Sequence, residues 1–378
     1  MNLQNVTTPF LLLDEARMQR NIERLNAHVK SLGVTLRPHV KTAKSVAVAE
    51  RMFDGGKGPI TVSTLLEAEY FAEHGYTDMI YAIGISPDKL ERVVALRKRG
   101  VDIAVLLDSQ AQAEYVAAAG REHGVTIAAL IEIDCDGERA GLRPHDEDIV
   151  SIAQYLHKHA ELRGVLLHAG GSYACESDAD KAAAAEHERA SAVLAAEAIR
   201  AAGVPCPVVS VGSTPTAHYA QDLTGVTEVR AGVYVFFDLV MAGINVCTLD
   251  DIALSVVTTV IGHRQDKGWI MTDAGWMAMS RDRGTAGQKV DQGYGVVADD
   301  EGHIIKDLIM IRTSQEHGVL ALREGSNARL PELPMGTKLR ILPNHACATA
   351  AQHNSFYVLD PHGRAGDISA VWPRINGW

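Results

Sequence analysis

The chain has 378 residues, of which 47% are hydrophobic and 22% are charged. This length and composition exclude a disordered or fibrous protein and leave room for two globular domains. The formal net charge of −11 argues against a general nucleic-acid or acidic-membrane surface, because such surfaces rely on clustered lysine and arginine. No apolar run approaches the roughly 20 residues needed to cross a bilayer.

The N-terminus and the cysteines predict a cytoplasmic protein. The first residues, MNLQNVTTPFLLLDEARMQ, lack a basic segment and contain only a short apolar run, so they do not form a signal peptide. The cysteines are scattered without a CxxC spacing, which is typical of a reducing compartment. We expect four of them to be small core residues and one to be functional: Cys135, Cys175, Cys206, Cys247 and, as the exception, Cys347.

Short apolar, β-branched runs alternate with helical segments between about residues 35 and 240. Eight runs are predicted as strands: 35–40, 60–63, 79–83, 103–107, 127–133, 163–168, 208–211 and 226–235. Helices are predicted between them at 65–74, 88–99, 110–123 and 180–202. Eight βα units close a barrel, and no run is followed by the GxGxxG typical of an open dinucleotide-binding sheet. We therefore predict an α/β fold with a (β/α)8 barrel rather than a doubly wound sheet.

The pattern changes after about residue 245. Apolar runs separated by Gly, Asp and Pro turns, without long helices, occur at 252–261, 269–273, 295–297, 338–342 and 355–358. They predict a β-rich second domain. We expect the barrel over residues 10–242 and the β-rich C-terminal domain over 243–378, with residues 1–9 associated with the second domain.

The segment RPHVKTAKS sets Lys41 just past the first predicted strand, at the end where barrel enzymes build their active sites. A lysine in such a position is, by itself, more often a solvated surface residue. Here Arg37 and His39 are also polar within a run expected to be buried, and buried polar groups need a partner or a function. Lys41 is therefore a candidate catalytic residue.

Other candidate residues follow the later barrel strands. DGERAGL and HAGGSY follow the fifth and sixth strands, and VGSTPT and EVRAGVYVF follow the seventh and eighth, where barrels bind phosphate. These residues also have structural interpretations. The glycines can form turns for purely steric reasons, Arg139 can pair with Glu138 or Asp136, and His168 can be a core residue. The residues are Arg139, His168, Tyr173, Gly212, Ser213, Thr214, Gly232, Val233 and Tyr234.

The motif PNHACAT sets His345 and Cys347 two residues apart. If the motif is a strand, both side chains lie on the same face and can converge on one ion. An imidazole and a thiolate suit Zn²⁺, with water or substrate in the open positions, and Mg²⁺, Mn²⁺ and Co²⁺ are alternatives. A lone HxC pair is more often structural, so the spacing alone leaves both interpretations open.

These motifs together resemble the D-threonine aldolase and D-serine dehydratase family of pyridoxal-phosphate enzymes, which have the alanine-racemase-like fold. The resemblance runs from TPFLLLD to PNHACAT. It implies that Lys41 carries pyridoxal 5′-phosphate as a Schiff base and removes the Cα proton, and that the residues after the fifth to eighth strands contact the cofactor. It also implies a homodimer, because enzymes of this type close the barrel mouth with the partner's β-rich domain.

The predicted phosphate site consists of the loops 212–214 and 232–234. We expect both loops to donate backbone N–H groups to the phosphate. On this hypothesis, Gly212→Val weakens cofactor binding but leaves the fold largely intact, because only the approach of the anion is blocked.

The resemblance also implies the reaction. The dehydratases of the family bind their metal through a His and a Cys at this spacing, whereas the aldolases carry His and Asp in an HxDPT segment. His345 and Cys347 therefore favour dehydration of a 3-hydroxy D-amino acid. The stretches STPTA, EVRAGVYVFFDLVM and DAGWMAMSRDRGTA favour D-threo-3-hydroxyaspartate, which gives oxaloacetate and ammonia. Dehydration of D-serine and aldol cleavage of D-threonine or 3-hydroxy-D-aspartate remain alternatives.

The second carboxylate of a hydroxyaspartate requires a cation, and Arg281 and Arg283 are candidates, although each has Asp282 as an alternative partner. Two other classes of protein fit less well. A non-catalytic pyridoxal-phosphate carrier is typically a single barrel, and a metal-dependent barrel hydrolase needs several ligands at strand ends, where this chain has no HxH. A further polar cluster has no assigned role: Gln315, Glu316 and His317.

Overall fold

Eight parallel strands form one sheet of the computed structural model, which describes residues 1–378. Their order is β2-β9-β8-β7-β6-β5-β4-β3. A bridge between His39 and Thr61 joins β2 to β3, with Val40 N donating to Thr61 O at 2.9 Å, and so closes the sheet into a barrel. The eight predicted strands and the fold class are confirmed. The strands are β2 (Thr35–Pro38), β3 (Ile60–Val62), β4 (Asp78–Gly84), β5 (Asp102–Leu107), β6 (Ala128–Ile133), β7 (Glu161–Leu167), β8 (Val208–Val211) and β9 (Glu228–Ala231).

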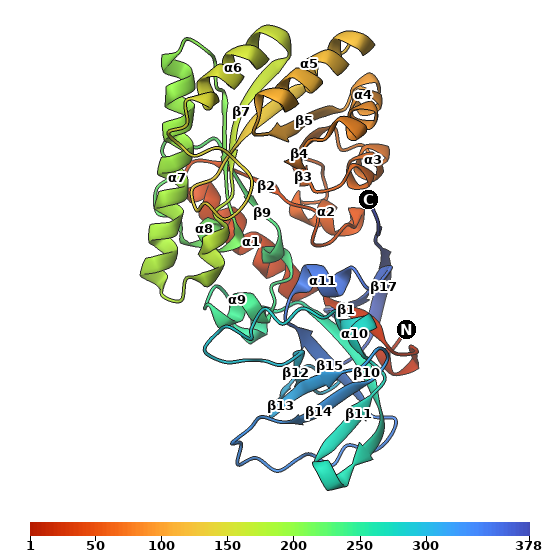
Figure 1. Ribbon diagram of the computed structural model, residues 1–378. Helices are drawn as coiled ribbons and strands as arrows, with labels where there is room; N and C mark the ends of the chain where they lie inside the picture. The colour runs from red at the N-terminus through yellow and green to blue at the C-terminus, as the bar shows by residue number, and fades with distance from the viewer. The chain divides into compact units, whose positions relative to one another are not determined.

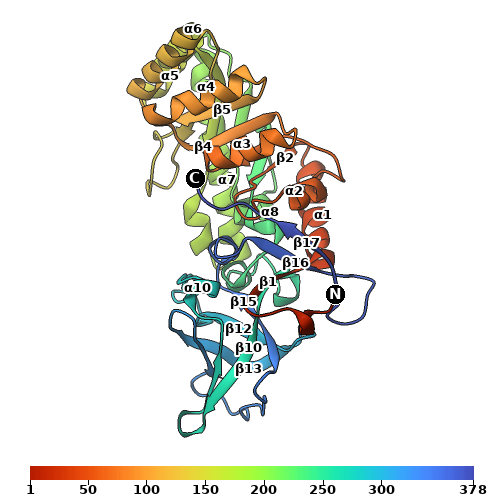
Figure 2. The same cartoon turned by 90° about the vertical axis from the view of Figure 1, so that its right-hand side faces the viewer.

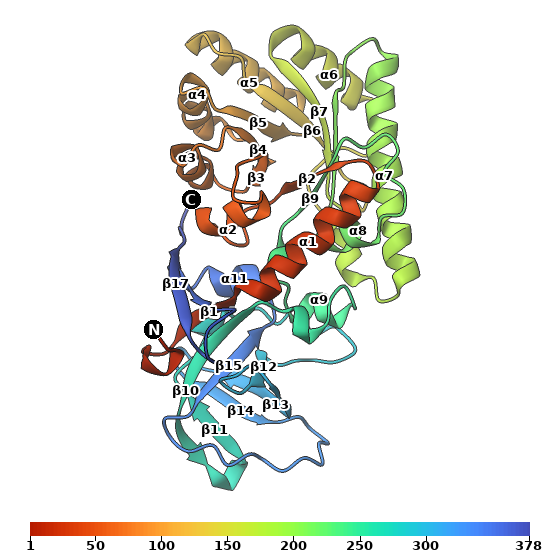
Figure 3. The same cartoon turned by 180° about the vertical axis from the view of Figure 1, so that it is seen from behind.

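Helices follow the strands and lie along the outside of this sheet (Figure 1). Several begin at a capping side chain: Thr64 Oγ1 accepts from Glu67 N, and Ser177 forms a capping box with Asp180, which satisfies N–H groups that the helix leaves unpaired. Helices α7 and α8 lie side by side (Figure 3). The four predicted helices are confirmed as α3, α4, α5 and α7. The helices are α2 (Val46–Met52), α3 (Leu65–Glu73), α4 (Leu90–Lys98), α5 (Gln110–His123), α6 (Asp148–His159), α7 (Asp178–Ala201) and α8 (Thr214–Tyr219).

The barrel sheet combines an apolar cluster with a buried ionic network. Arg37 donates from Nε to Glu228 at 2.8 Å and from Nη1 to Asp78 at 2.7 Å. Arg230 donates to Ser210 Oγ and to Leu167 O, both at 2.7 Å. Arg37 therefore has a structural partner, as its buried position required. The apolar cluster, in which each fully buried Leu or Ile contributes about 1.5–3 kcal/mol, comprises Ile80, Ala104, Leu106, Ala128, Leu130 and Leu166.

A second sheet contains nine strands, centred on β10 (Leu254–Arg264). Strand β10 pairs with β11, β15 and β1, so six of the strands form a closed circuit in the order β10-β11-β14-β13-β12-β15. Strands β1, β16 and β17 extend it (Figure 2). The predicted β-rich character of the chain after about residue 245 is confirmed. The remaining strands are β1 (Phe10–Asp14), β11 (Trp269–Thr272), β12 (Gly295–Ala298), β13 (Ile304–Thr313), β14 (Gly318–Leu322), β15 (Lys338–Pro343), β16 (Ser355–Leu359) and β17 (Ile368–Pro373).

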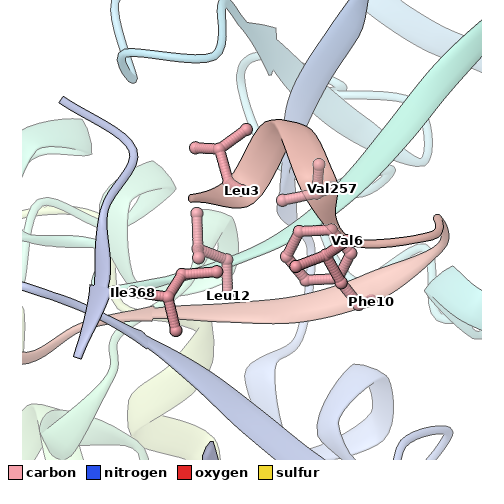
Figure 4. Close-up of a cluster of buried hydrophobic side chains, with 6 residues drawn as sticks. All are labelled: Leu3, Val6, Phe10, Leu12, Val257 and Ile368. Carbon is pink, nitrogen blue, oxygen red and sulfur yellow. The ribbon is translucent and has the colours of Figure 1, made fainter. Parts of the chain in front are cut away.

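The chain divides into two compact units, Met1–Ile22 with Val233–Asn376 and Glu23–Gly232 with Gly377–Trp378. We call them the β-rich unit and the barrel unit. Residues 10–22, which the sequence analysis assigned to the barrel, pack with the β-rich unit because β1 pairs with β10 and β16. The division falls within α1 (Glu15–Ser31). The N-terminal segment belongs to an apolar cluster of Leu3, Val6, Phe10, Leu12, Val257 and Ile368 (Figure 4).

None of the helices combines the length and the apolar character that a membrane crossing demands. All five cysteines are free, and two of them, Cys206 and Cys247, are buried.

Candidate active site

Lys41 lies in the loop that follows β2 and is exposed. Its backbone N–H donates to His39 Nδ1 at 3.4 Å, and Lys44 N donates to Val40 O at 2.7 Å. Lys44 has a φ of +48° and forms an ion pair with Glu67, whose carboxylate is fully buried, at 3.1 Å. This ion pair holds the loop that carries Lys41 against α3.

Two neutral imidazoles lie near Lys41. His168 Nδ1 donates to Gly212 O at 2.9 Å, and burial, followed by the charge of Arg139, lowers the pKa of His168 to about 3, with Lys41 contributing. Burial and the charge of Lys41 also hold the pKa of His39 well below its usual value. Lys41, His39 and His168 therefore lie at the carboxyl end of the barrel, close enough for the charge of Lys41 to act on both imidazoles. Because Nδ1 of neutral His168 carries its proton, Nε2 is a hydrogen-bond acceptor.

Arg139 and Tyr173 lie in the loops that follow β6 and β7. Arg139 is exposed, and its Nη2 lies 4.0 Å from Glu132 Oε1, so neither Glu138 nor Asp136 is its partner. The ring of Tyr173 lies 6.2 Å from that of His168. The structure therefore brings Arg139, His168 and Tyr173 to the same end of the barrel as Lys41.

The N–H group of Gly212, which was predicted to donate to the phosphate, has a partner within the chain. Its N–H donates to Glu188 Oε1 at 3.1 Å, and Ser213 N donates to Thr216 Oγ1 at 3.0 Å. Gly212 has a φ of +134°, and a Cβ there would lie 2.1 Å from Arg230 O. Glycine is therefore required by the close approach of β8 to β9, and Gly212→Val would disturb the barrel itself.

The hydroxyl of Thr214 is better suited to bind a ligand than the N–H group of Gly212. Thr214 Oγ1 is buried without a hydrogen-bond partner, and an unsatisfied buried group of this kind costs about 1–3 kcal/mol. Gly232 lies against the Lys41 loop, since a Cβ there would be 3.2 Å from Thr42 Oγ1 and 3.3 Å from His39 O. An unsatisfied donor and a backbone that approaches the Lys41 loop closely fit a phosphate-bearing cofactor such as pyridoxal phosphate.

Val233 and Tyr234 follow Gly232 directly but belong to the β-rich unit. Tyr234 is fully buried and its hydroxyl has no hydrogen-bond partner. Burial raises the pKa of Tyr234, so it remains a neutral phenol. The hydroxyl of Tyr234 is therefore a hydrogen-bond donor without a partner in the chain.

The prediction that HAC lies on a strand is wrong. Strand β15 ends at Pro343, His345 is the N-cap of α11 (Ala346–Ala350), and Cys347 lies in the first turn. The two side chains nevertheless converge, and a hydrogen bond joins them. Burial opposes protonation of His345, but Asp282, Cys347 and Asp238 outweigh it and raise its pKa to about 11.

Asp282 is a site residue that the sequence analysis missed. Its Oδ2 accepts from His345 Nδ1 at 2.7 Å, across 63 residues of sequence. A carboxylate on Nδ1 fixes the imidazole tautomer and leaves Nε2 to bind a metal. The only sequence signal was an acidic residue between two arginines, and it was interpreted as a possible partner for them. Asp238 supports the same turn by accepting from Ala346 N at 2.9 Å.

The two arginines beside Asp282 have other partners. Arg281 lies 4.5 Å above the ring of Trp276, and Arg283 pairs with Asp291 at 2.6 Å. The predicted alternative, pairing with Asp282, is therefore wrong for both. The cluster at 315–317 forms the turn between β13 and β14, where backbone groups of Ser314 and Gln315 accept from Trp276 and Met277.

The fold and the site define the class of protein: a parallel barrel with a lysine after its first strand, followed by a β-rich unit with a His–Cys pair. Residues 13–240 match the family model "Alanine racemase, N-terminal domain", and residues 253–359 match "Putative serine dehydratase domain". The chain belongs to this alanine-racemase-like family, and the predicted resemblance is confirmed.

Three curated relatives span almost the whole chain. The chain is 51% identical to the D-threo-3-hydroxyaspartate dehydratase of Delftia sp. (strain HT23), covering 100% of this chain and 99% of the relative. It is 28% identical to the D-serine dehydratase of Dictyostelium discoideum, with 95% of each chain covered. It is also 28% identical to the 3-hydroxy-D-aspartate aldolase of Paracoccus denitrificans (strain Pd 1222), with 99% and 92% covered.

Solved structures show the same relationship. The Delftia dehydratase covers 100% of both chains with a TM-score of 0.95 and 51% identity. Two variants of that enzyme, in which a cysteine or a histidine is replaced by alanine, have TM-scores of 0.96, and the cysteine variant is in a metal-free form. The D-threonine aldolase of Filomicrobium marinum has a TM-score of 0.83 at 26% identity, covering 99% and 96%.

Proposed function

We propose that this chain is a pyridoxal-phosphate- and metal-dependent dehydratase that converts D-threo-3-hydroxyaspartate to oxaloacetate and ammonia. The observation that carries the proposal is the convergence of His345 and Cys347 in a chain that is 51% identical, over its whole length, to a dehydratase of that substrate. We also propose that residues 10–242 bind the cofactor, that residues 243–378 with 1–9 carry the metal, and that the enzyme acts as a cytoplasmic homodimer.

In the proposed cofactor site, Lys41 binds pyridoxal phosphate covalently. The cofactor supplies an electron sink for the electron pair left at Cα when its proton is removed. Lys41 Nζ would be the base that takes this proton. Its amine is suited to this role because the loop that carries it is held by the Lys44–Glu67 ion pair.

The other residues of the proposed cofactor site orient the ligand. His168 is held by its bond to Gly212 O and offers a neutral Nε2 acceptor. Arg139 is an exposed cation with only a distant carboxylate, which suits an anionic oxygen of the ligand. The remaining members of the site are Tyr173 beside His168 and, around the phosphate, Gly212, Ser213, Thr214, Gly232, Val233 and Tyr234, with Thr214 Oγ1 as the unsatisfied donor.

In the proposed metal site, His345 and Cys347 bind a divalent ion, of which Zn²⁺ suits this donor pair best and Mg²⁺, Mn²⁺ and Co²⁺ are alternatives. A bound ion supplies a Lewis acid for the 3-hydroxyl of the substrate. Asp282 keeps the imidazole of His345 in the required tautomer. Two protein ligands leave positions open for water and substrate.

The products of the purified enzyme test the proposal. The enzyme is loaded with pyridoxal phosphate and Zn²⁺ and incubated with D-threo-3-hydroxyaspartate, D-serine and D-threonine in separate reactions. We expect ammonia and oxaloacetate from hydroxyaspartate, with the highest kcat/KM of the three substrates. Glycine and an aldehyde would assign the chain to the aldolases, and preferential release of ammonia from D-serine would assign it to the D-serine dehydratases.

A further inference from the structure

A second group of metal-binding side chains lies in the barrel unit. It consists of Cys135 and Asp136, in the loop after β6, and His187 on α7. One ligand atom from each of the three lies within 4.8 Å of the other two. His345 and Cys347 belong to the β-rich unit and share no residue with this group. We propose that Cys135, Asp136 and His187 form a separate zinc-binding site.

The backbone holds the first two side chains of this group in place. Asp134 Oδ1 accepts from Asp136 N at 3.1 Å and from Gly137 N at 2.9 Å, which fixes the turn. Gly171 N donates to Asp136 Oδ2 at 2.9 Å, so the other oxygen, Oδ1, faces the thiol of Cys135 at 3.3 Å. One carboxylate oxygen is therefore held by the protein, and the second is directed toward the other ligands.

The third ligand comes from a rigid element. His187 lies within the long helix α7, and its Nε2 is 3.3 Å from Cys135 O. His187 is exposed, whereas Cys135 and Asp136 are half-buried. A metal held by these three groups would therefore be open to solvent on the side of His187, where water would occupy a fourth position.

The donor set selects the type of ion. Thiolate, imidazole and carboxylate are the usual ligands of Zn²⁺, whereas Mg²⁺ and Ca²⁺ prefer oxygen alone. Ligand atoms around a tetrahedral zinc ion lie about 3.3–3.8 Å apart, so modest side-chain rotation closes the present group. Binding replaces the thiol proton, which Cys135 now donates to Asp136, and releases it to solvent.

Zinc in this position would link the loop after β6 to α7. That loop also carries Arg139. The site would therefore act by ordering the loop and would stabilise the barrel unit, because a ligand that binds only the folded state raises its stability.

The experiment measures zinc in the full chain after the other proposed metal ligands are removed. The His345→Ala/Cys347→Ala protein is stripped with chelator, dialysed against Zn²⁺ alone and analysed for bound zinc. We expect one zinc ion per chain, lost on adding either His187→Ala or Cys135→Ser. Cys175→Ser and His123→Ala, which alter a half-buried thiol and a half-buried imidazole, are matched controls and should retain the zinc.

A second readout guards against variants that fold poorly. In the His345→Ala/Cys347→Ala protein, Co²⁺ should give a thiolate-to-metal charge-transfer absorption that disappears with Cys135→Ser and weakens with His187→Ala. Zinc should raise the Tm of the His345→Ala/Cys347→Ala protein but not of the same protein with His187→Ala. Absence of zinc from the double variant, or zinc that is indifferent to His187→Ala and Cys135→Ser, would overturn the proposal.

Discussion

Lys41 is distinguished from the other lysines by its surroundings. It is exposed, it follows β2 at the carboxyl end of the barrel, and its charge adds to the effect of burial in lowering the pKa of both His39 and His168. No carboxylate forms an ion pair with it, whereas Lys44, three residues later, is bound to Glu67. Lys41 is therefore available for chemistry, whereas Lys44 supports the loop.

Lys41→Ala should abolish turnover and the visible absorbance of the bound cofactor, because no other amine occupies this position. The measurement is the absorption spectrum and the ammonia-release rate of the purified variant incubated with pyridoxal phosphate. Lys98→Ala, an exposed lysine at the end of α4, is the control and should retain both. Cofactor absorbance that persists in Lys41→Ala would show that another lysine holds pyridoxal phosphate.

The depressed pKa of His168 predicts how stability depends on pH. In the folded chain the pKa is about 3, whereas in the unfolded chain it is about 6.5. Only the unfolded state therefore binds a proton as the pH falls below about 6.5, so the contribution of this residue is complete above that pH and is lost as the pH falls toward 3. The loss is at most about 1.4 kcal/mol per pH unit.

Urea unfolding at pH 7.5, 6 and 5 measures this effect. The free energy of unfolding should fall less steeply with decreasing pH in His168→Gln than in the wild type. His123→Gln, at a histidine on the surface beside Glu91, serves as the comparison and should follow the wild-type slope. Identical slopes for His168→Gln and wild type would mean that His168 is protonated in the folded state.

At the scale of elements, pairs of elements determine the local chemistry of both proposed sites. The contact between β8 and β9 requires a glycine at 212, and α7 supplies Glu188 to the N–H groups of Ala169 and Gly212. In the β-rich unit, the end of β15 and the start of α11 bring His345 toward Cys347 and Asp282. Each site therefore depends on how two or more elements meet.

Gly212→Ala should destabilise the chain by about 2–4 kcal/mol, because the added Cβ would overlap Arg230 O and the φ of +134° is unfavourable for alanine. Chemical denaturation gives the free energy of unfolding. The control is Gly170→Ala, since a Cβ at Gly170 has no atom within 4 Å and the φ there is negative. A Gly212→Ala protein that is as stable as wild type would mean that β8 and β9 can separate without cost.

Asp282→Asn should weaken zinc binding at His345 and Cys347 about 10–100-fold, because the carboxylate orients the imidazole and raises its basicity. The affinity is measured by titration in the His187→Ala background, so that zinc at the second proposed site does not contribute. Asp266→Asn, at an exposed ion pair with Arg264, is the control. Equal zinc affinities of the two variants would argue that Asp282 does not orient His345.

At the scale of the whole molecule, the proposed cofactor lysine and the proposed metal ligands belong to different compact units. Removal of the metal should therefore stop dehydration without releasing pyridoxal phosphate. His345→Ala should have the same effect, because it removes one of only two protein ligands. Exchange of the Cα proton with solvent should continue in this variant, since Lys41 is unchanged.

Three measurements on one sample check this expectation: cofactor absorbance, deuterium incorporation at Cα and ammonia release, before and after exhaustive chelation. Restoring Zn²⁺ should restore ammonia release in the wild type but not in His345→Ala. Full ammonia release from the metal-depleted wild type would mean that the HAC segment is structural and would remove the main support for a dehydratase.

The sequence alone determined the architecture of the barrel. All eight strand runs and four of the helices could be predicted, because burial on both faces and helical periodicity are properties of short segments. The family resemblance then assigned roles to Lys41, His345 and Cys347. Strands β1, β13, β14 and β17 were missed. The patterns of β13 and β17 are interrupted by charged or exposed positions, whereas β1 and β14 are short apolar runs of five residues.

Only the tertiary structure decided how distant residues combine. Asp282 meets His345 across 63 residues, Glu188 meets Gly212 across 24, and β1 joins a sheet whose other strands begin at residue 254. Local sequence patterns do not predict such pairings, because packing and the need to satisfy buried polar groups determine which residues meet. For the same reason HAC, whose spacing suggested a strand, forms the start of a helix, where His345 at the N-cap lies close to Cys347.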